Sequence, residues 1–192
     1  MEKLTGLKKI KTAVFISGTG SNLKNIIKFS KIKKSPISID LIVSNTKNAK
    51  GLIFADQFKI KKKIFNSKNF KSVEKRLLIF LKREKIKFIC LAGFMKILSK
   101  DFIKKFNGKI INIHPSLLPK YKGLNTHSRA INNNDKFAGC TVHYVTAKLD
   151  SGKIILQQRT KIKISDNSDS LAKKILKQEY KLYPAAIMKI FN

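Results

Sequence analysis

Apolar and polar positions along the chain follow two alternating patterns. Short continuous apolar runs predict buried strands, and segments with apolar residues three or four positions apart predict helices between them. The runs that predict strands are 12–16, 39–43, 63–65, 88–92, 110–113, 139–145 and 154–164. Helical spacing is found from residue 22 onward, at 51–58, 71–84 and 126–132, in a short segment capped by Ser99 that extends to 106, and at 168–191, where a break near Pro184 is expected.

The order of these segments indicates the fold class. Repeated alternation of continuously apolar strands with helices is typical of an α/β protein whose sheet is covered on both faces. We therefore expect a doubly wound, mostly parallel open sheet. The sequence contains neither an internal repeat nor a linker, so residues 1–192 are expected to form a single domain.

The chain carries an extreme positive charge. It has 38 lysines and four arginines against 11 acidic residues, which gives a formal net charge of +31. The lysines are spread over almost every segment and form no basic arm of the kind that binds nucleic acid. Because codons for Lys, Ile and Asn are all A/T-rich, compositional drift is the favoured interpretation. A nucleic-acid surface and the attraction of small anionic substrates are the alternatives.

Cysteine usage and the chain's N-terminal segment indicate a cellular compartment. Cys90 and Cys140 lie inside apolar runs, so they are expected to be core thiols in a reducing environment rather than a disulfide or a metal pair. Residues 1–6 lack the apolar region of a signal peptide, and no run reaches the roughly 18 apolar residues of a membrane span. A cytoplasmic location is expected.

A glycine-containing turn at 17–23 follows the first predicted strand and opens a helix. Glycines let the backbone turn sharply, and the N–H groups and dipole at a helix start favour a phosphate. Leu23 stands where a dinucleotide fingerprint has its third glycine, so a monophosphate is the preferred ligand. The alternative is an ordinary strand–helix turn with Ser21 or Asn22 as the N-cap.

A second motif, at 112–119, begins where a predicted strand ends. Open α/β sheets bind ligands at the carboxyl ends of their strands. With a period of two, Asn112 and His114 point to the same side. An amide and an imidazole facing one spot suit acyl transfer, because one can stabilise an oxyanion while the other transfers a proton. The alternative is a lone histidine that caps a turn before Pro115.

A third motif is the turn at 149–152, which contains Asp150. If Asp150 lies near His114, it favours the cationic imidazole; the alternative is a commonplace acidic turn. His114, His127 and His143 lack the spacing of zinc ligands, and the chain has no GxSxG nucleophile motif. His143 lies inside a predicted strand and is interpreted as structural.

Taken together, four segments resemble the phosphoribosylglycinamide formyltransferase family, folate-dependent formyltransferases of purine synthesis. The segments are 18–22, 91–98, 112–119 and 149–152, and the likeness extends from about residue 11 to 184. The NIHPSLLP sequence at 112–119 is typical of enzymes that use formyl-folate, and the GSN turn points to glycinamide ribonucleotide. The resemblance implies a Rossmann-like formyltransferase fold and a metal-independent transfer of the formyl group of 10-formyltetrahydrofolate to the substrate's amine.

The resemblance also implies roles for individual residues. Asn112 would stabilise the tetrahedral oxyanion, His114 would act as general acid, and Asp150 would tune His114 and organise a water. The substrate phosphate would be held by Gly20, Ser21 and Asn22, and the amine or ribose by Glu179. The folate would contact Met95, Lys96, Ile97, Leu98, Asn112, Thr146, Ala147, Lys148, Leu149 and Asp150. Three positions depart from the family: Lys96 replaces a frequent arginine, Lys122 a frequent proline, and Asn125 a frequent histidine.

Three other functions remain alternatives. A methionyl-tRNA formyltransferase would explain the charge, but it normally has a further C-terminal domain and lacks the GSN turn. A formyltetrahydrofolate hydrolase usually has an N-terminal regulatory domain, and only about ten residues precede the first predicted strand here. A basic nucleic-acid-binding protein would need its lysines clustered on one face. The expected partners are small-molecule substrates, with no membrane, at most non-specific nucleic acid, and a monomer or weak homodimer.

Overall fold

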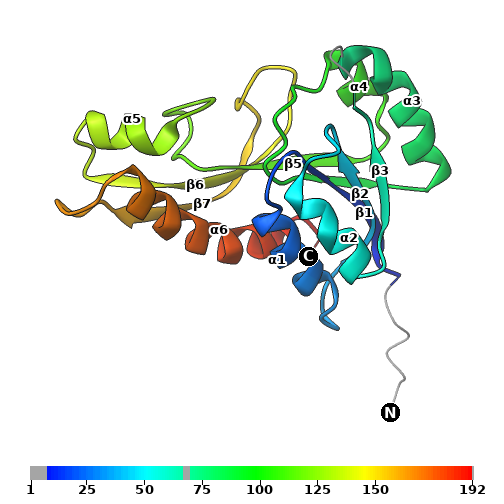
Figure 1. Ribbon diagram of the computed structural model, residues 1–192, viewed down its shortest axis with the longest axis horizontal. Helices are drawn as coiled ribbons and strands as arrows, with labels where there is room; N and C mark the ends of the chain where they lie inside the picture. Colours follow the sequence, from blue (N-terminus) through cyan, green and yellow to red (C-terminus); the bar gives the residue numbers. More distant parts are fainter. Residues whose placement is uncertain (1–7, 67–69, 192) are drawn as a thin grey trace.

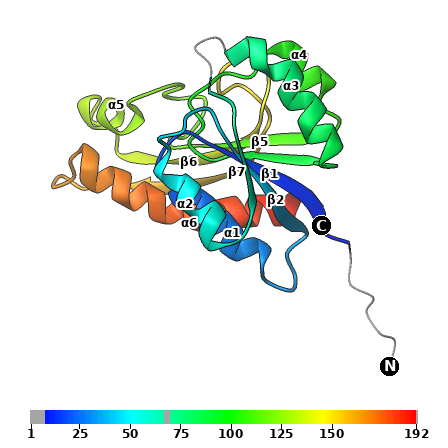
Figure 2. The same ribbon diagram turned by 45° about the vertical axis from the view of Figure 1, so that its right-hand side comes forward.

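The sequence folds around one mixed β-sheet, shown in Figures 1 and 2. The computed structural model describes residues 8–66 and 70–191; the segment used to judge a signal peptide lies outside this part of the chain. In chain order the elements are β1 (Ile10–Ile16), α1 (Ser21–Ser30), β2 (Ile37–Ser44), the 3-10 helix η1 (Lys50–Leu52), α2 (Ile53–Gln57), β3 (Lys61–Ile64), α3 (Phe70–Arg83), β4 (Phe88–Leu91), α4 (Lys100–Lys105), β5 (Lys109–His114), α5 (Thr126–Asn132), β6 (Phe137–Tyr144), β7 (Ile154–Lys161) and α6 (Ser168–Phe191).

The strand order is β3-β2-β1-β4-β5-β6-β7. The first five strands in this order are parallel, whereas β6 runs antiparallel to both β5 and β7. The chain therefore winds outward from β1 in one direction to β3 and then in the other direction to β5. This order confirms the prediction of a doubly wound, mostly parallel open sheet.

Successive residues of β1 point to opposite faces of the sheet, and each face has its own core. Val14 and Ile16 belong to the core that includes buried residues of α1 and α6. Ala13 and Phe15 belong to the core that includes buried residues of α3 and α4. In Figure 1 these two helix pairs lie on opposite sides of the sheet. Full burial of one large apolar side chain stabilises the folded state by about 1.5–3 kcal/mol. Both cores contain such side chains, so both contribute strongly to the free energy of folding.

The predicted core thiols are confirmed. Cys90 and Cys140 are both free and buried, and both belong to the core beneath α1 and α6. Burial raises the pKa of the Cys140 thiol to about 12, with the charge of Glu179 adding to the effect. Burial likewise raises the pKa of Cys90. Both thiols therefore stay protonated and unreactive at neutral pH.

The last helix runs unbroken through Pro184, so the prediction of a break there is wrong. Proline lacks the N–H that would bond the carbonyl of Tyr180, four residues earlier. The side-chain amide of Asn25, on α1, donates to that carbonyl at 2.8 Å instead. Tyr183 and Ala186, on either side of the proline, are fully buried. Packing and a substitute donor therefore keep the helix continuous.

The turn into α1 also differs from the N-cap interpretation. The N-cap residue is Gly20, with a φ of 75° and no side-chain cap, rather than Ser21 or Asn22. A Cβ atom at Gly20 would lie 2.7 Å from the Cα of Gly51. Both the left-handed backbone and this close approach require glycine. Because no side chain caps the helix, its first N–H groups are open toward a ligand.

Candidate active site

A cavity of about 700 Å³ opens at the carboxyl ends of β4 and β5. Its walls come from the loops after β4, β5 and β6, from the first residues of α1 and α5, and from one side of α6. It lies where open α/β sheets bind ligands. Of the residues singled out in the sequence, the cavity is lined by Asn22, Met95, Lys96, Ile97, Leu98, Asn112, His114, Thr146, Lys148, Leu149, Asp150 and Glu179. Gly20, Ser21 and Ala147 are not among its lining residues.

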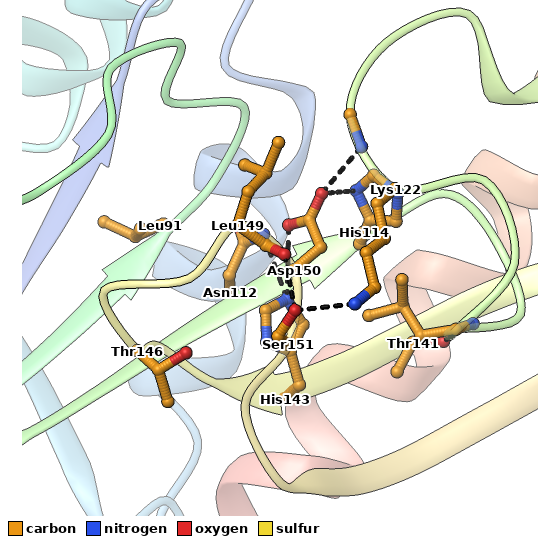
Figure 3. Close-up of polar contacts among 12 residues, drawn as sticks. Leu91, Asn112, His114, Lys122, Thr141, His143, Thr146, Leu149, Asp150 and Ser151 are labelled. Carbon is orange, nitrogen blue, oxygen red and sulfur yellow. Dashed lines mark hydrogen bonds and ion pairs between the residues drawn. The ribbon is translucent and has the colours of Figure 1, made fainter.

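His114 and Asp150 both line the cavity, and their side chains face each other (Figure 3). His114 Nδ1 lies 3.4 Å from Asp150 Oδ2, and both side chains are about 7% exposed. His114 Nε2 lies 2.8 Å from the carbonyl oxygen of Tyr121. A carbonyl only accepts, so Nε2 carries a hydrogen. The ring is therefore held between a backbone carbonyl and the Asp150 carboxylate.

Asp150 occupies an unusual backbone position. Its φ is 44°, in the left-handed region that few residues other than glycine adopt. Its Oδ2 accepts a hydrogen bond from the backbone N–H of Gly123 at 2.9 Å, and its Oδ1 lies 3.7 Å from His143 Nε2. Gly152 follows closely, where a Cβ atom would lie 1.7 Å from the carbonyl oxygen of Tyr144. The turn at 149–152 thus aims the carboxylate at two imidazoles.

Asn112 is held by His143, its neighbour in the sheet register. His143 Nδ1 lies 2.9 Å from the carbonyl of Tyr144, so this nitrogen carries the hydrogen and Nε2 accepts. Burial lowers the pKa of His143, which favours this neutral form. The Asn112 amide nitrogen lies 3.3 Å from His143 Nε2 and donates to it. A primary amide has two N–H donors, so one remains for a ligand.

Asn22 and Glu179 meet at the start of α1. Asn22 Nδ2 donates to Glu179 Oε2 at 2.6 Å, and both residues are buried. Burial raises the pKa of the Glu179 carboxyl, although the bond from Asn22 opposes the shift. The Asn22 Oδ1 atom is buried without a hydrogen-bond partner among the described residues. A buried polar atom without a partner costs about 1–3 kcal/mol, which a ligand donor would recover.

The segment at 95–98 presents backbone and apolar groups to the cavity. Met95 and Ile97 are about two-thirds exposed, whereas Leu98 is buried. The backbone N–H of Met95 donates to Ser17 Oγ at 2.8 Å, which ties this loop to the end of β1. Across the cavity, Leu149 is also half exposed. Exposed apolar side chains on both of these walls favour a ligand with apolar surface.

Two histidines belong to the site that sequence reasoning did not assign to it. His143 lies in a strand as predicted, yet its ring contacts Asn112 and Asp150, so the structural interpretation is incomplete. His127, on α5, lines the cavity, and its Nε2 is buried without a hydrogen-bond partner among the described residues. Burial lowers its pKa, and the nearby His114 adds to this effect. Only the register of β5 against β6 brings His143 to Asn112, and the sequence does not reveal that register.

Two features are absent from the described residues. Within 8–66 and 70–191, no group of three or more His, Cys, Asp or Glu side chains is arranged to hold a metal ion. In the same part of the chain, no helix combines the length and apolarity needed to span a membrane.

Comparison with known proteins identifies the family. Residues 10–187 match the formyl transferase family model. The chain is 42% identical to phosphoribosylglycinamide formyltransferase of Haemophilus influenzae over 92% of this chain and 85% of that protein. It is 40% identical to human trifunctional purine biosynthetic protein adenosine-3 over 94% of its own length, but it spans only 18% of that protein. The crystal structure of phosphoribosylglycinamide formyltransferase from Brucella melitensis superposes with a TM-score of 0.90, at 39% identity over 95% of this chain and 96% of that one. The chain therefore belongs to the formyl transferase family.

Proposed function

We propose that the chain transfers the formyl group of 10-formyltetrahydrofolate to the amine of 5-phosphoribosylglycinamide in de novo purine synthesis. One observation carries the proposal. Asn112, His114 and Asp150 line the same cavity as Asn22, beside the start of α1, and Glu179. The names of the similar proteins from Haemophilus influenzae and Brucella melitensis support the choice of substrate.

In this proposal the ribonucleotide lies beside Asn22 and Glu179. Gly20, Ser21 and Asn22 hold its phosphate through the open N–H groups and dipole of α1. Glu179, whose carboxylate is 2.6 Å from Asn22, binds the amine or ribose side. The folate occupies the walls formed by Met95, Lys96, Ile97 and Leu98 and by Thr146, Ala147, Lys148 and Leu149, with Asn112 and Asp150 next to the formyl group.

The reaction then follows from the side chains of Asn112, His114 and Asp150. The amine nitrogen attacks the formyl carbon, a new C–N bond forms, and negative charge develops on the formyl oxygen. Asn112 and cationic His114 stabilise that oxygen, and removing one such donor typically lowers the rate by about 10²–10³-fold. A proton from the attacking amine reaches the folate nitrogen through His114, or through a water held by Asp150, as the original C–N bond breaks. The step requires hydrogen bonds and proton transfer, and we propose no metal.

The wider setting of the chain is also part of the proposal. Residues 1–192 form a single formyltransferase domain, an assignment supported by the one sheet that runs through the described residues. Its partners are small molecules, and it works in the cytoplasm as a monomer or weak homodimer. Buried, protonated Cys90 and Cys140 are compatible with a reducing compartment. Nucleic acid binds non-specifically, if at all, through the dispersed lysines.

The test is release of tetrahydrofolate from 10-formyltetrahydrofolate, measured with and without 5-phosphoribosylglycinamide. We expect release only when the ribonucleotide is present. His114→Ala should lower turnover by about 10²–10⁴-fold, the usual contribution of a positioned acid or base. Circular dichroism and thermal unfolding of the variant establish that it is folded.

The other outcomes favour the competing functions. Release without the ribonucleotide would favour a formyltetrahydrofolate hydrolase. Release that needs initiator methionyl-tRNA would favour the tRNA formyltransferase. If neither acceptor supports release and the protein binds nucleic acid with a steep salt dependence, a basic nucleic-acid-binding protein becomes the better description.

A further inference from the structure

A lysine joins two loops behind the pair of His114 and Asp150. Lys122 lies in the loop after β5, and Ser151 lies in the loop after β6. Lys122 Nζ donates a hydrogen bond to Ser151 Oγ at 2.6 Å, as Figure 3 shows. Both residues are partly buried, and neither lines the cavity. The contact therefore supports the site from behind without touching its contents.

Three successive residues of the first loop contact three different parts of the site. The carbonyl of Tyr121 accepts from His114 Nε2 at 2.8 Å. Lys122 contacts Ser151, and the N–H of Gly123 donates to Asp150 Oδ2 at 2.9 Å. A displacement of this loop would thus move the partners of both His114 and Asp150. The loop fixes the relative position of the two side chains.

The second loop needs such support because its backbone is strained. The left-handed φ of Asp150 is costly for a residue with a Cβ atom and persists only when surrounding contacts enforce it. Ser151 Oγ donates to the carbonyl of Leu149 at 2.7 Å, which closes the turn around Asp150. The same oxygen accepts from Lys122. The two bonds at one hydroxyl thus link the shape of the turn to the position of the neighbouring loop.

We propose that Lys122 and Ser151 are positioning residues that hold the Asp150 turn against His114. The catalytic consequence of this proposal rests on the proposed formyl transfer. The contact between the loops can be tested without it.

The first experiment compares kcat and KM for Lys122→Met, Lys122→Arg and Lys153→Met. Lys122→Met keeps the aliphatic stem but removes the donor, so kcat should fall about fivefold to tenfold, the size of one lost hydrogen bond. KM for the ribonucleotide should change less than twofold, because the contacts of Lys122 and Ser151 do not include Asn22 or Glu179. Lys122→Arg restores a donor and should recover most of kcat. Lys153→Met removes an exposed lysine two residues from Ser151 and should leave kcat unchanged. A kcat for Lys122→Met equal to that of Lys153→Met would overturn the proposal.

A double-mutant cycle tests the pair directly. If Lys122 acts through Ser151, the double variant Lys122→Met, Ser151→Ala should be no slower than the worse single variant. Additive losses would overturn the assignment, because they would show that the two residues act independently.

Amide exchange of Gly123 tests the contact in the protein without substrates. Its N–H is bonded to Asp150, so exchange should be slow in the wild type and about fivefold to tenfold faster in Lys122→Met. Unchanged exchange would overturn the proposed link between the loops. If the wild type fails to transfer a formyl group while Gly123 exchange responds to Lys122→Met, the proposed function fails and the positioning contact stands.

Discussion

Two buried carboxylates with different surroundings define the chemistry of the site at the scale of single residues. Asp150 accepts a hydrogen bond from the backbone N–H of Gly123, and the imidazole of His114 lies 3.4 Å from the same carboxylate oxygen, so groups that can donate face its charge. Glu179 has the Asn22 amide, and burial raises its pKa. A carboxylate whose charge is balanced by hydrogen-bond donors can stabilise a nearby cation and orient a water. A buried carboxylate with few donors is instead stabilised when a cationic ligand binds to it. The two residues should therefore respond differently to removal of charge.

Asp150→Asn is expected to lower kcat by about 10²-fold or more, the usual contribution of a proton-transfer partner. The amide keeps the shape of the side chain but neither stabilises a cationic His114 nor accepts on both of its polar atoms. KM for the ribonucleotide should remain close to the wild-type value, because its phosphate and amine partners are untouched. Steady-state kinetics across neutral pH measures both quantities. Asp101→Asn, at an exposed position of α4, is the matched control. Turnover of Asp150→Asn that equals the wild type at every pH would refute the coupling.

Glu179→Gln should make the protein more stable and a poorer enzyme. Because burial raises the pKa of Glu179, the folded state binds more protons than the unfolded state between the ordinary carboxyl pKa and the raised one. The free energy of unfolding of the wild type therefore decreases as pH rises through that window. Glutamine does not ionise, so the variant does not show this decrease. Urea unfolding at about pH 5 and about pH 8 should show that the variant gains stability mainly at the higher pH.

Glu179→Gln is also expected to weaken binding of the ribonucleotide. Hydrogen bonds to charged groups contribute about 1.5–3 kcal/mol, so KM for the ribonucleotide should rise by about tenfold or more. KM for the folate should stay near the wild-type value, and this serves as the internal control. A variant with unchanged KM for both substrates would remove Glu179 from the binding site.

Some of these residues could be found from the sequence and others could not. Asn112 and His114 lie two positions apart at a strand end, so strand periodicity predicts that they share a side. His143 meets Asn112 only through strand register, and Asn22 meets Glu179 across 157 residues of chain. Pairs that depend on tertiary packing leave no local pattern. For Glu179 the family resemblance, rather than periodicity, supplied the assignment.

At the scale of elements, each predicted strand and helix has a counterpart in the structure, although several ends differ: the strand predicted at 154–164 ends at Lys161, and the helix predicted at 51–58 is divided into η1 and α2. The helix at 126–132 has the predicted bounds, and Ser99 accepts the backbone N–H of Phe102 as an N-cap should. Local spacing and capping were sufficient in both cases. Pro184 was misread because its missing hydrogen bond is replaced from α1, which local sequence does not show. The N-cap at Gly20 was misread because a close backbone approach excludes every side chain there.

Asn25→Ala is expected to destabilise the fold through α6. The substitution leaves the carbonyl of Tyr180 without the donor that replaces the missing N–H of Pro184. An unsatisfied, partly buried carbonyl costs about 1–3 kcal/mol. For a chain of this length each kcal/mol lowers Tm by about 2–4 °C, so thermal unfolding should show a clear decrease. Asn107→Ala, at an exposed position after α4, should change Tm little. Equal Tm values for the two variants would show that α6 does not need Asn25.

At the scale of the whole molecule, the site depends on the chain from its first helix to its last. Asn22 on α1 and Glu179 on α6 both line the cavity. Helix α6 also packs against α1, α5, β6 and β7. The positive charge is equally global, because lysines occur in every layer of the fold. The positive electrostatic field produced by these lysines attracts anions from any direction. Two explanations of the charge make different predictions: either it helps to capture anionic substrates, or it reflects codon composition alone.

Ionic strength separates these two explanations. The ribonucleotide and the folate are both anionic, so a functional field should make kcat/KM fall as salt rises from about 0.05 to about 0.5 M, because the screening length shrinks well below about 10 Å. The loss should appear in KM, since kcat depends on contacts among buried side chains, where screening by salt is weak. The corresponding riboside, which lacks the phosphate, should show a smaller salt dependence, and a neutral osmolyte should show none. If kcat/KM for the ribonucleotide is as insensitive to salt as that for the riboside, then the charge of +31 contributes nothing to substrate capture. The dispersed lysines would then be a product of compositional drift, which a stable two-layered core tolerates because exposed lysines keep their charge in water.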